Sequence, residues 1–139
     1  AGGARNHRGN LSDWVMFKDN HLTALGIVEA VRSARDRWPG RTVHVECDRL
    51  EQVVQALDAG ADALLLDNMT PDEVRAAVVV AEEHATTNGT RRALLEVSGG
   101  ITLENVGSYA GTGADVVSSG SLTNSSPVLD IGLDIEVHR

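Results

Sequence analysis

Two carboxylates, Glu46 and Asp67, lie where apolar runs of the sequence end. Glu46 comes late in the run 42–47, and Asp67 directly follows the wholly apolar run 63–66. A carboxylate in such surroundings is costly unless it meets a cation or a metal ion. Mg²⁺ takes oxygen ligands, keeps bound waters and commonly bridges to substrate phosphates. We therefore predict that Glu46 and Asp67 serve a Mg²⁺ site, directly or through water or phosphate.

Cationic side chains form a second candidate set, made of His7, Arg8 and Lys18. Lys18 is the only lysine in a chain with twelve Lys and Arg residues, and it follows the apolar run 14–17. Such cations suit carboxylates, and arginine adds a bidentate fork. The sequence thus predicts a pocket for a substrate with an acidic part, although a solvated charge is the alternative for Lys18.

Two glycine-containing loops form the third set, Ser98-Gly99-Gly100 and Ser119-Gly120-Ser121. The first is expected to open directly into a helix, so that backbone N–H groups and the helix dipole point at one spot. Glycine also lets an oxyanion approach the backbone closely. Each loop alone is equally compatible with a tight turn, but paired late loops of this kind typically hold phosphate in barrel enzymes.

The composition of the chain argues against several classes of protein. The chain has 139 residues, a net charge of −8 and no basic cluster, which argues against a general nucleic-acid binder. Its single cysteine, Cys47, permits no internal disulfide and indicates a reducing compartment. No apolar run approaches the length of a membrane span, so we expect a cytoplasmic protein.

The elements that position these residues alternate between strand and helix, which is typical of a parallel α/β sheet. Near-continuous hydrophobicity predicts strands covered on both faces. Gly60 and Gly113, each just before a strand, are placed to adopt the left-handed conformation. We predict strands at 14–18, 42–47, 63–66, 93–97 and 115–118, and helices at 27–38, 49–59, 71–84 and 103–110, with a shorter helix after Thr123.

Helix starts are marked by capping-box patterns from Asp48 to Glu51 and from Thr70 to Glu73, the second strengthened by Pro71. Asp48 is accordingly interpreted as a helix cap. A complete (β/α) barrel takes about 250 residues, so the fold expected here is a portion of such a barrel.

The chain resembles a known family, nicotinate-nucleotide pyrophosphorylase (carboxylating), also called quinolinate phosphoribosyltransferase. Six stretches in family order carry the resemblance: Gly2-Gly3-Ala4-Arg5-Asn6-His7-Arg8, Phe17-Lys18-Asp19-Asn20-His21, Val45-Glu46-Cys47-Asp48, Leu65-Leu66-Asp67-Asn68, Glu96-Val97-Ser98-Gly99-Gly100-Ile101 and Gly120-Ser121-Leu122-Thr123.

The resemblance implies transfer of a phosphoribosyl group from 5-phosphoribosyl 1-diphosphate to quinolinate, with loss of CO₂ and release of pyrophosphate, in NAD biosynthesis. It implies that His7, Arg8 and Lys18 face the quinolinate carboxylates. It also implies that Glu46 and Asp67 serve the ribose and Mg²⁺-pyrophosphate region, with Lys18, Glu46 and Asp67 as the catalytic set. Both glycine-containing loops would hold phosphate.

The resemblance further implies a type II phosphoribosyltransferase barrel and a homodimer. Residues 1–139 would be its carboxyl-terminal part, without the amino-terminal domain and early barrel strands. Two departures are Asn124, where the family often has histidine, and Ser119, where it usually has an aliphatic residue. Alternatives are a molybdenum-associated paralogue, a Schiff-base aldolase using Lys18, and an inactive fragment.

Overall fold

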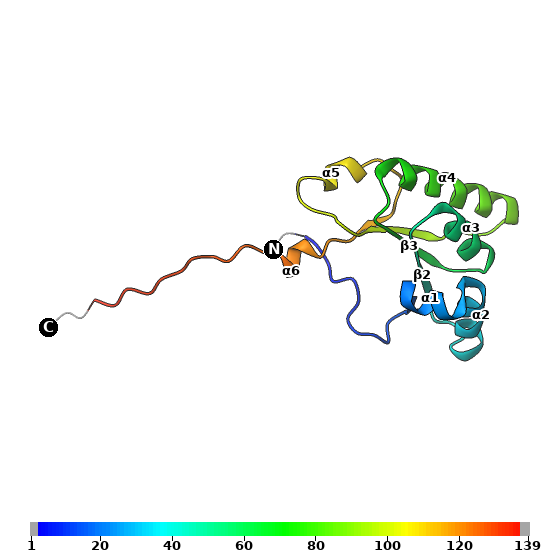
Figure 1. Ribbon diagram of the computed structural model, residues 1–139, viewed down its shortest axis with the longest axis horizontal. Coiled ribbons are helices and arrows are strands. Elements are labelled where there is room, and N and C mark those ends of the chain that lie inside the picture. Colours follow the sequence, from blue (N-terminus) through cyan, green and yellow to red (C-terminus); the bar gives the residue numbers. More distant parts are fainter. Residues whose placement is uncertain (1–2, 137–139) are drawn as a thin grey trace.

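The computed structural model describes residues 3–136, so the first two and the last three residues of the predicted domain lie outside the described residues. Five strands form one parallel sheet in the order β1-β2-β3-β4-β5. Helices alternate with them along the chain, and Figure 1 shows α2, α3 and α4 gathered on one side of the sheet. The strands are β1 (Val15–Phe17), β2 (Val43–Cys47), β3 (Ala63–Asp67), β4 (Leu94–Ser98) and β5 (Val116–Val117).

The helices are α1 (Asp19–Leu25), α2 (Ile27–Arg37), α3 (Leu50–Asp58), α4 (Pro71–Asn88), α5 (Val106–Tyr109) and α6 (Ser121–Asn124). Sequential parallel strands with helices on one side form an arc of a (β/α) barrel, which confirms the predicted fold class. The predicted strands agree with these to within one or two residues. Helix α1 was not predicted. Helix α6 begins at Ser121, before the expected position.

The hydrophobic core lies between the sheet and the helices, and it takes every second residue of β2, β3 and β4. In β2, Val43, Val45 and Cys47 join the core cluster, while His44 and Glu46 between them point to the opposite face. We call this opposite face the inner face. The prediction that strands are covered on both faces is confirmed for β2, whose five residues are all buried, and for most of β3 and β4. Helices cover one face, and the inner face differs in carrying polar side chains.

One of the two predicted capping boxes is present. The Thr70 side chain accepts the Glu73 N–H, and the Glu73 carboxylate accepts the Thr70 N–H at 2.8 Å. The box at Asp48 is wrong, because α3 is capped by Arg49 without a side-chain hydrogen bond, and the Asp48 N–H donates to the Gln52 side chain. The Gln52 side chain thus accepts the backbone hydrogen bond that was expected to go to Glu51.

The left-handed glycines are confirmed: φ is 85° at Gly60 and 94° at Gly113.

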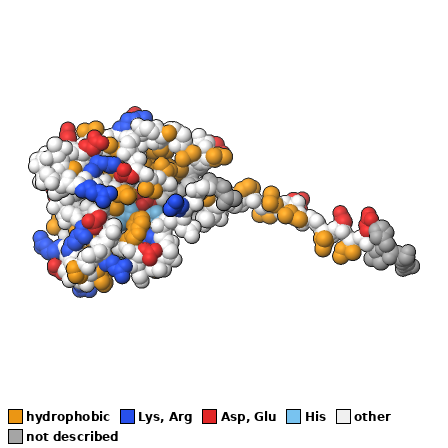
Figure 2. Space-filling model, turned by 180° about the vertical axis from the view of Figure 1, so that it is seen from behind, with side chains coloured by type: hydrophobic (Ala, Val, Ile, Leu, Met, Phe, Trp, Pro, Cys, Tyr) orange, Lys and Arg blue, Asp and Glu red, His pale blue; other side chains and the backbone are white. Residues whose placement is uncertain are grey.

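No helix within residues 3–136 combines the length and apolarity needed to cross a membrane. Beyond α6 the chain runs away from the body (Figure 1) and exposes alternate apolar side chains, Leu129, Ile131 and Leu133 among them. Figure 2 shows acidic and basic side chains interspersed on the body.

Candidate active site

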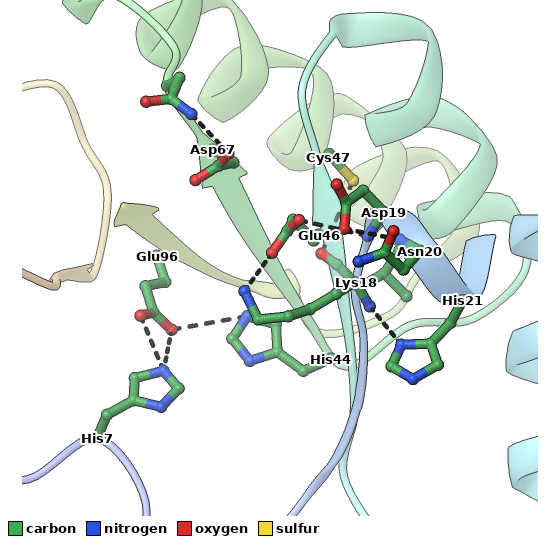
Figure 3. Close-up of polar contacts among 12 residues, drawn as sticks. His7, Lys18, Asp19, Asn20, His21, His44, Glu46, Cys47, Asp67 and Glu96 are labelled. Carbon is green, nitrogen blue, oxygen red and sulfur yellow. Dashed lines mark hydrogen bonds and ion pairs between the residues drawn. The ribbon is translucent and has the colours of Figure 1, made fainter. Parts of the chain in front are cut away.

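Strand register brings the polar candidates together on the inner face. Glu46 pairs with Leu65, and Leu65 pairs with Glu96, so both carboxylates lie on the same face as Leu65. Asp67 lies two residues beyond Leu65 and therefore shares that face. Glu46 and Asp67 lie at the carboxyl ends of their strands, where barrels form their active sites, and Glu96 lies at the middle of β4. Figure 3 shows Lys18, Glu46 and Asp67 around one region.

Lys18 and Glu46 form an ion pair across the ends of β1 and β2. The Lys18 Nζ lies 2.7 Å from Glu46 Oε2, and the Asp19 N–H donates to Glu46 Oε1 at 3.3 Å. Glu46 is 9% exposed, whereas the Lys18 side chain is 52% exposed. The buried carboxylate is thus satisfied by one cation and one amide, while the ammonium remains open to an anionic ligand.

Asp67 ends β3 beside this pair. Burial raises the pKa of Asp67, and the negative charge of Glu46 raises it further, while the Asn68 side-chain amide, which donates to Asp67 Oδ2 at 2.7 Å, lowers it. A divalent cation would remove the repulsion that Glu46 exerts on the Asp67 carboxylate. Glu46 and Asp67 therefore fit a Mg²⁺ ion.

The glycine loop after β4 is packed against the loop after β3. Gly99 has φ +83°, and a Cβ there would lie 2.5 Å from Asn68 Oδ1 and 2.7 Å from the Asn68 backbone nitrogen. Gly100 has φ +61° and an open environment, with Asn68 Oδ1 at 3.8 Å. The expectation that this loop opens directly into a helix is wrong, because α5 begins only at Val106 and has four residues.

The loops after β4 and β5 are adjacent, as predicted. The Ser119 Oγ donates to the Ile101 carbonyl at 2.5 Å and lies 2.7 Å from Ser121 Oγ. Gly120 has an ordinary φ of −71°. Ser119 thus joins the two loops, and Ser98, Gly100 and Ser121 remain beside the same end of the sheet.

The cationic candidates separate into two places. A cavity of about 610 Å³ beside β1 is lined by Arg8 and Lys18, together with Leu11, Ser12, Trp14, Val15, Met16, His21, Trp38 and Arg41. It has the positive charge and the apolar walls that an aromatic dicarboxylate requires. His7 does not line it: the His7 Nε2 lies 2.8 and 2.9 Å from the two oxygens of Glu96.

Glu96 and His44 are two inner-face residues that were not among the predicted site residues. Glu96 is 1% exposed, and its Oε1 accepts the Ser118 hydroxyl. The sequence does carry a signal for Glu96, which is its spacing from Ser98. The two residues are two positions apart, so both face the inner side of β4. In β2 the same spacing joins His44 to Glu46.

A sequential parallel sheet with helices on one side defines the chain as part of a (β/α) barrel, with charged groups at the strand ends where barrels bind ligands. More narrowly, residues 1–134 match the family model "Quinolinate phosphoribosyl transferase, C-terminal domain", and the chain belongs to that family.

Proteins with similar sequences carry the name of one enzyme. The human nicotinate-nucleotide pyrophosphorylase [carboxylating] is 43% identical over 136 residues, which are 96% of this chain and 44% of that protein. The Mycobacterium leprae protein of the same name is 43% identical over 135 residues, 96% of this chain and 46% of its own. The chain therefore spans less than half the length of these relatives.

Solved structures agree. The nicotinate-nucleotide pyrophosphorylase from Ehrlichia chaffeensis has a TM-score of 0.84 at 39% identity, covering 97% of this chain and 47% of that one. Thiamine phosphate pyrophosphorylase from Pyrococcus furiosus, with a TM-score of 0.57 at 18% identity over 76% of this chain and 49% of that one, shares the fold alone. These matches do not favour the molybdenum-associated or aldolase alternatives.

Proposed function

We propose that this chain is the barrel part of an enzyme that transfers a phosphoribosyl group from 5-phosphoribosyl 1-diphosphate to quinolinate, yielding nicotinate mononucleotide, pyrophosphate and CO₂ for NAD biosynthesis. The observation that carries the proposal is the convergence of Lys18, Glu46 and Asp67 at the carboxyl ends of adjacent strands, in a chain that matches the family over residues 1–134.

Glu46 and Asp67 are the residues that would hold Mg²⁺. When bound, Mg²⁺ neutralises the charge that develops on departing pyrophosphate. Lys18, held by Glu46 at 2.7 Å, meets a quinolinate carboxylate and keeps the ring nitrogen directed at the anomeric carbon. Arg8 provides the second cation in the same cavity. The catalysis is therefore positioning and electrostatic stabilisation, and no protein nucleophile is needed.

The remaining candidates bind phosphate or substrate in this proposal. Ser98, Gly99 and Gly100 with Ser119, Gly120 and Ser121 border the phosphate of the ribosyl group, with Gly99 acting through its packing on Asn68. His7, held by Glu96 outside the cavity that Arg8 and Lys18 line, is assigned to quinolinate by the family resemblance alone. As the family resemblance implies, the protein works as a cytoplasmic homodimer, without a nucleic-acid or membrane partner.

The test is a chimera in which residues 3–136 replace the matching segment of the human relative. With quinolinate, 5-phosphoribosyl 1-diphosphate and Mg²⁺, the chimera should form nicotinate mononucleotide, and chelation of Mg²⁺ should stop it. Lys18→Ala should lower turnover about 100-fold, the usual loss for one charge-stabilising donor. Arg32→Ala, which removes a surface cation 3.7 Å from Glu29, is the matched control and should keep full activity.

A folded chimera that makes no nicotinate mononucleotide would refute the function, and equal activity of the Lys18→Ala variant would refute the role of Lys18. Sedimentation of the chimera tests the dimer. Borohydride trapping of Lys18 with a carbonyl substrate would instead support the aldolase alternative.

A further inference from the structure

A second cluster of ligand-type side chains lies on the inner face, beside the Lys18–Glu46 pair (Figure 3). It consists of His7, His44 and Glu96, whose ligand atoms all lie within 4.8 Å of one another. The His7 Nε2 lies 2.8 Å from Glu96 Oε1, and the His44 Nε2 lies 3.7 Å from Glu96 Oε2. We call these three residues the His-His-Glu cluster.

His44 is the unexplained member. Its side chain is fully buried, and neither ring nitrogen makes a hydrogen bond. Buried polar atoms without partners are rare in folded proteins and call for a physical reason. Imidazole nitrogens are common ligands of transition-metal ions, so a bound ion would account for the unpartnered ring.

We propose that the His-His-Glu cluster binds one divalent transition-metal ion, Zn²⁺ in the first instance, through His7, His44 and Glu96. Zn–N and Zn–O bonds of about 2.0–2.2 Å in tetrahedral geometry separate neighbouring ligand atoms by about 3.3 Å. The separations of 2.8 and 3.7 Å bracket that value. Two histidines and a glutamate are also a known three-ligand zinc set, which leaves the fourth position for water or a ligand.

Surrounding groups hold the ligands in place. The Ser118 hydroxyl donates to Glu96 Oε1, an outer contact of the kind that orients a metal-binding carboxylate. The Trp14 ring packs against both histidines, with centroid distances of 4.8 Å to His7 and 5.2 Å to His44. These contacts keep the three ligand atoms within 4.8 Å of one another, so small side-chain movements suffice to bind an ion, which limits the ordering cost.

The site differs from the Mg²⁺ site of the proposed function. Imidazole favours Zn²⁺ and its neighbours in the first transition row, whereas Glu46 and Asp67 offer oxygen alone, the choice of Mg²⁺. The inference goes beyond the proposed function and does not depend on turnover. It does bear on His7, because a bound metal ion would occupy the nitrogen that now contacts Glu96.

The experiment is a Zn²⁺ titration of the metal-free chain by calorimetry, with excess Mg²⁺ present. We expect one Zn²⁺ per chain. His44→Gln and Glu96→Gln should each weaken binding at least tenfold, since loss of even an outer partner costs about 10–100-fold. His84→Gln is the matched control: His84 lies 3.3 Å from Asp58, outside the cluster, and its loss should leave affinity unchanged.

Two further measurements keep the proposal testable if a variant does not fold. Co²⁺ bound to the unaltered chain should give the visible spectrum of a site with nitrogen and oxygen ligands, without the thiolate band that Cys47 would add. Cu²⁺ should quench the fluorescence of Trp14. Zn²⁺ binding that is absent, that is lost in excess Mg²⁺, or that persists unchanged in His44→Gln would overturn the proposal.

Discussion

Substitution of Gly99 tests whether the packing of the glycine loop against Asn68 stabilises the fold. A non-glycine residue at φ +83° costs about 1–2 kcal/mol, because its Cβ crowds the backbone in the left-handed region. The new Cβ would also lie 2.7 Å from the Asn68 backbone nitrogen, an atom held by its own hydrogen bond to the Ser98 carbonyl. Forced contacts of this kind cost about 1–3 kcal/mol. Gly99→Ala should thus destabilise the chain by about 2–5 kcal/mol.

Gly100→Ala is the matched control, since φ is +61° and the nearest atom to a Cβ is 3.8 Å away. It should cost only the conformational part, about 1–2 kcal/mol. Urea unfolding of both variants, with equal slopes, measures the difference directly. In an Asn68→Gly background the penalty at Gly99 should shrink without vanishing, because the backbone nitrogen stays. Equal unfolding midpoints for the Gly99→Ala and Gly100→Ala variants would refute the packing argument.

Three other outcomes are expected. Burial raises the pKa of the Cys47 thiol to about 12, so iodoacetamide should label Cys47 in urea and spare it in the folded chain; equal labelling would contradict this. Thr70→Ala removes the acceptor of the Glu73 N–H and should lower the free energy of unfolding by about 1 kcal/mol in urea titrations; an unchanged midpoint would count against the cap. The raised pKa of Asp67 means that its ionisation favours the unfolded chain, so stability falls as pH rises from the ordinary aspartate range towards the folded pKa. In EDTA, the stability of Asp67→Asn relative to the parent should therefore increase from about pH 3 to neutrality, and a constant difference would refute this shift.

The proposed function and the metal proposal meet at His7. The residue lies beside Glu96 and not in the cavity that Arg8 and Lys18 share. Activity of the chimera measured with and without Zn²⁺ would therefore show whether the His-His-Glu cluster regulates substrate binding, while the calorimetric titration decides the cluster itself.

Local features of the sequence sufficed for the order of elements. The apolar runs of the five strands, the cap at Thr70 and the left-handed Gly60 and Gly113 each depend on neighbouring residues in the chain. The ends of the apolar runs also pointed to Lys18, Glu46 and Asp67. The prediction of the Asp48 cap failed because an acceptor and a glutamate three residues later do not fix which residue begins the helix.

Only the tertiary structure decided which polar side chains meet. Strand register and the two-residue period of a sheet turn His44 and Glu96 toward the inner face. His7 reaches Glu96, 89 residues away, from the segment before β1. The same holds for Gly99, because the atoms with which a Cβ at this position would collide belong to Asn68 on a neighbouring loop. The apolar pattern of an element depends on residues that are neighbours in the chain, so it can be recognised in the sequence. Contacts between distant strands depend on strand register and packing, which are set only when the chain folds.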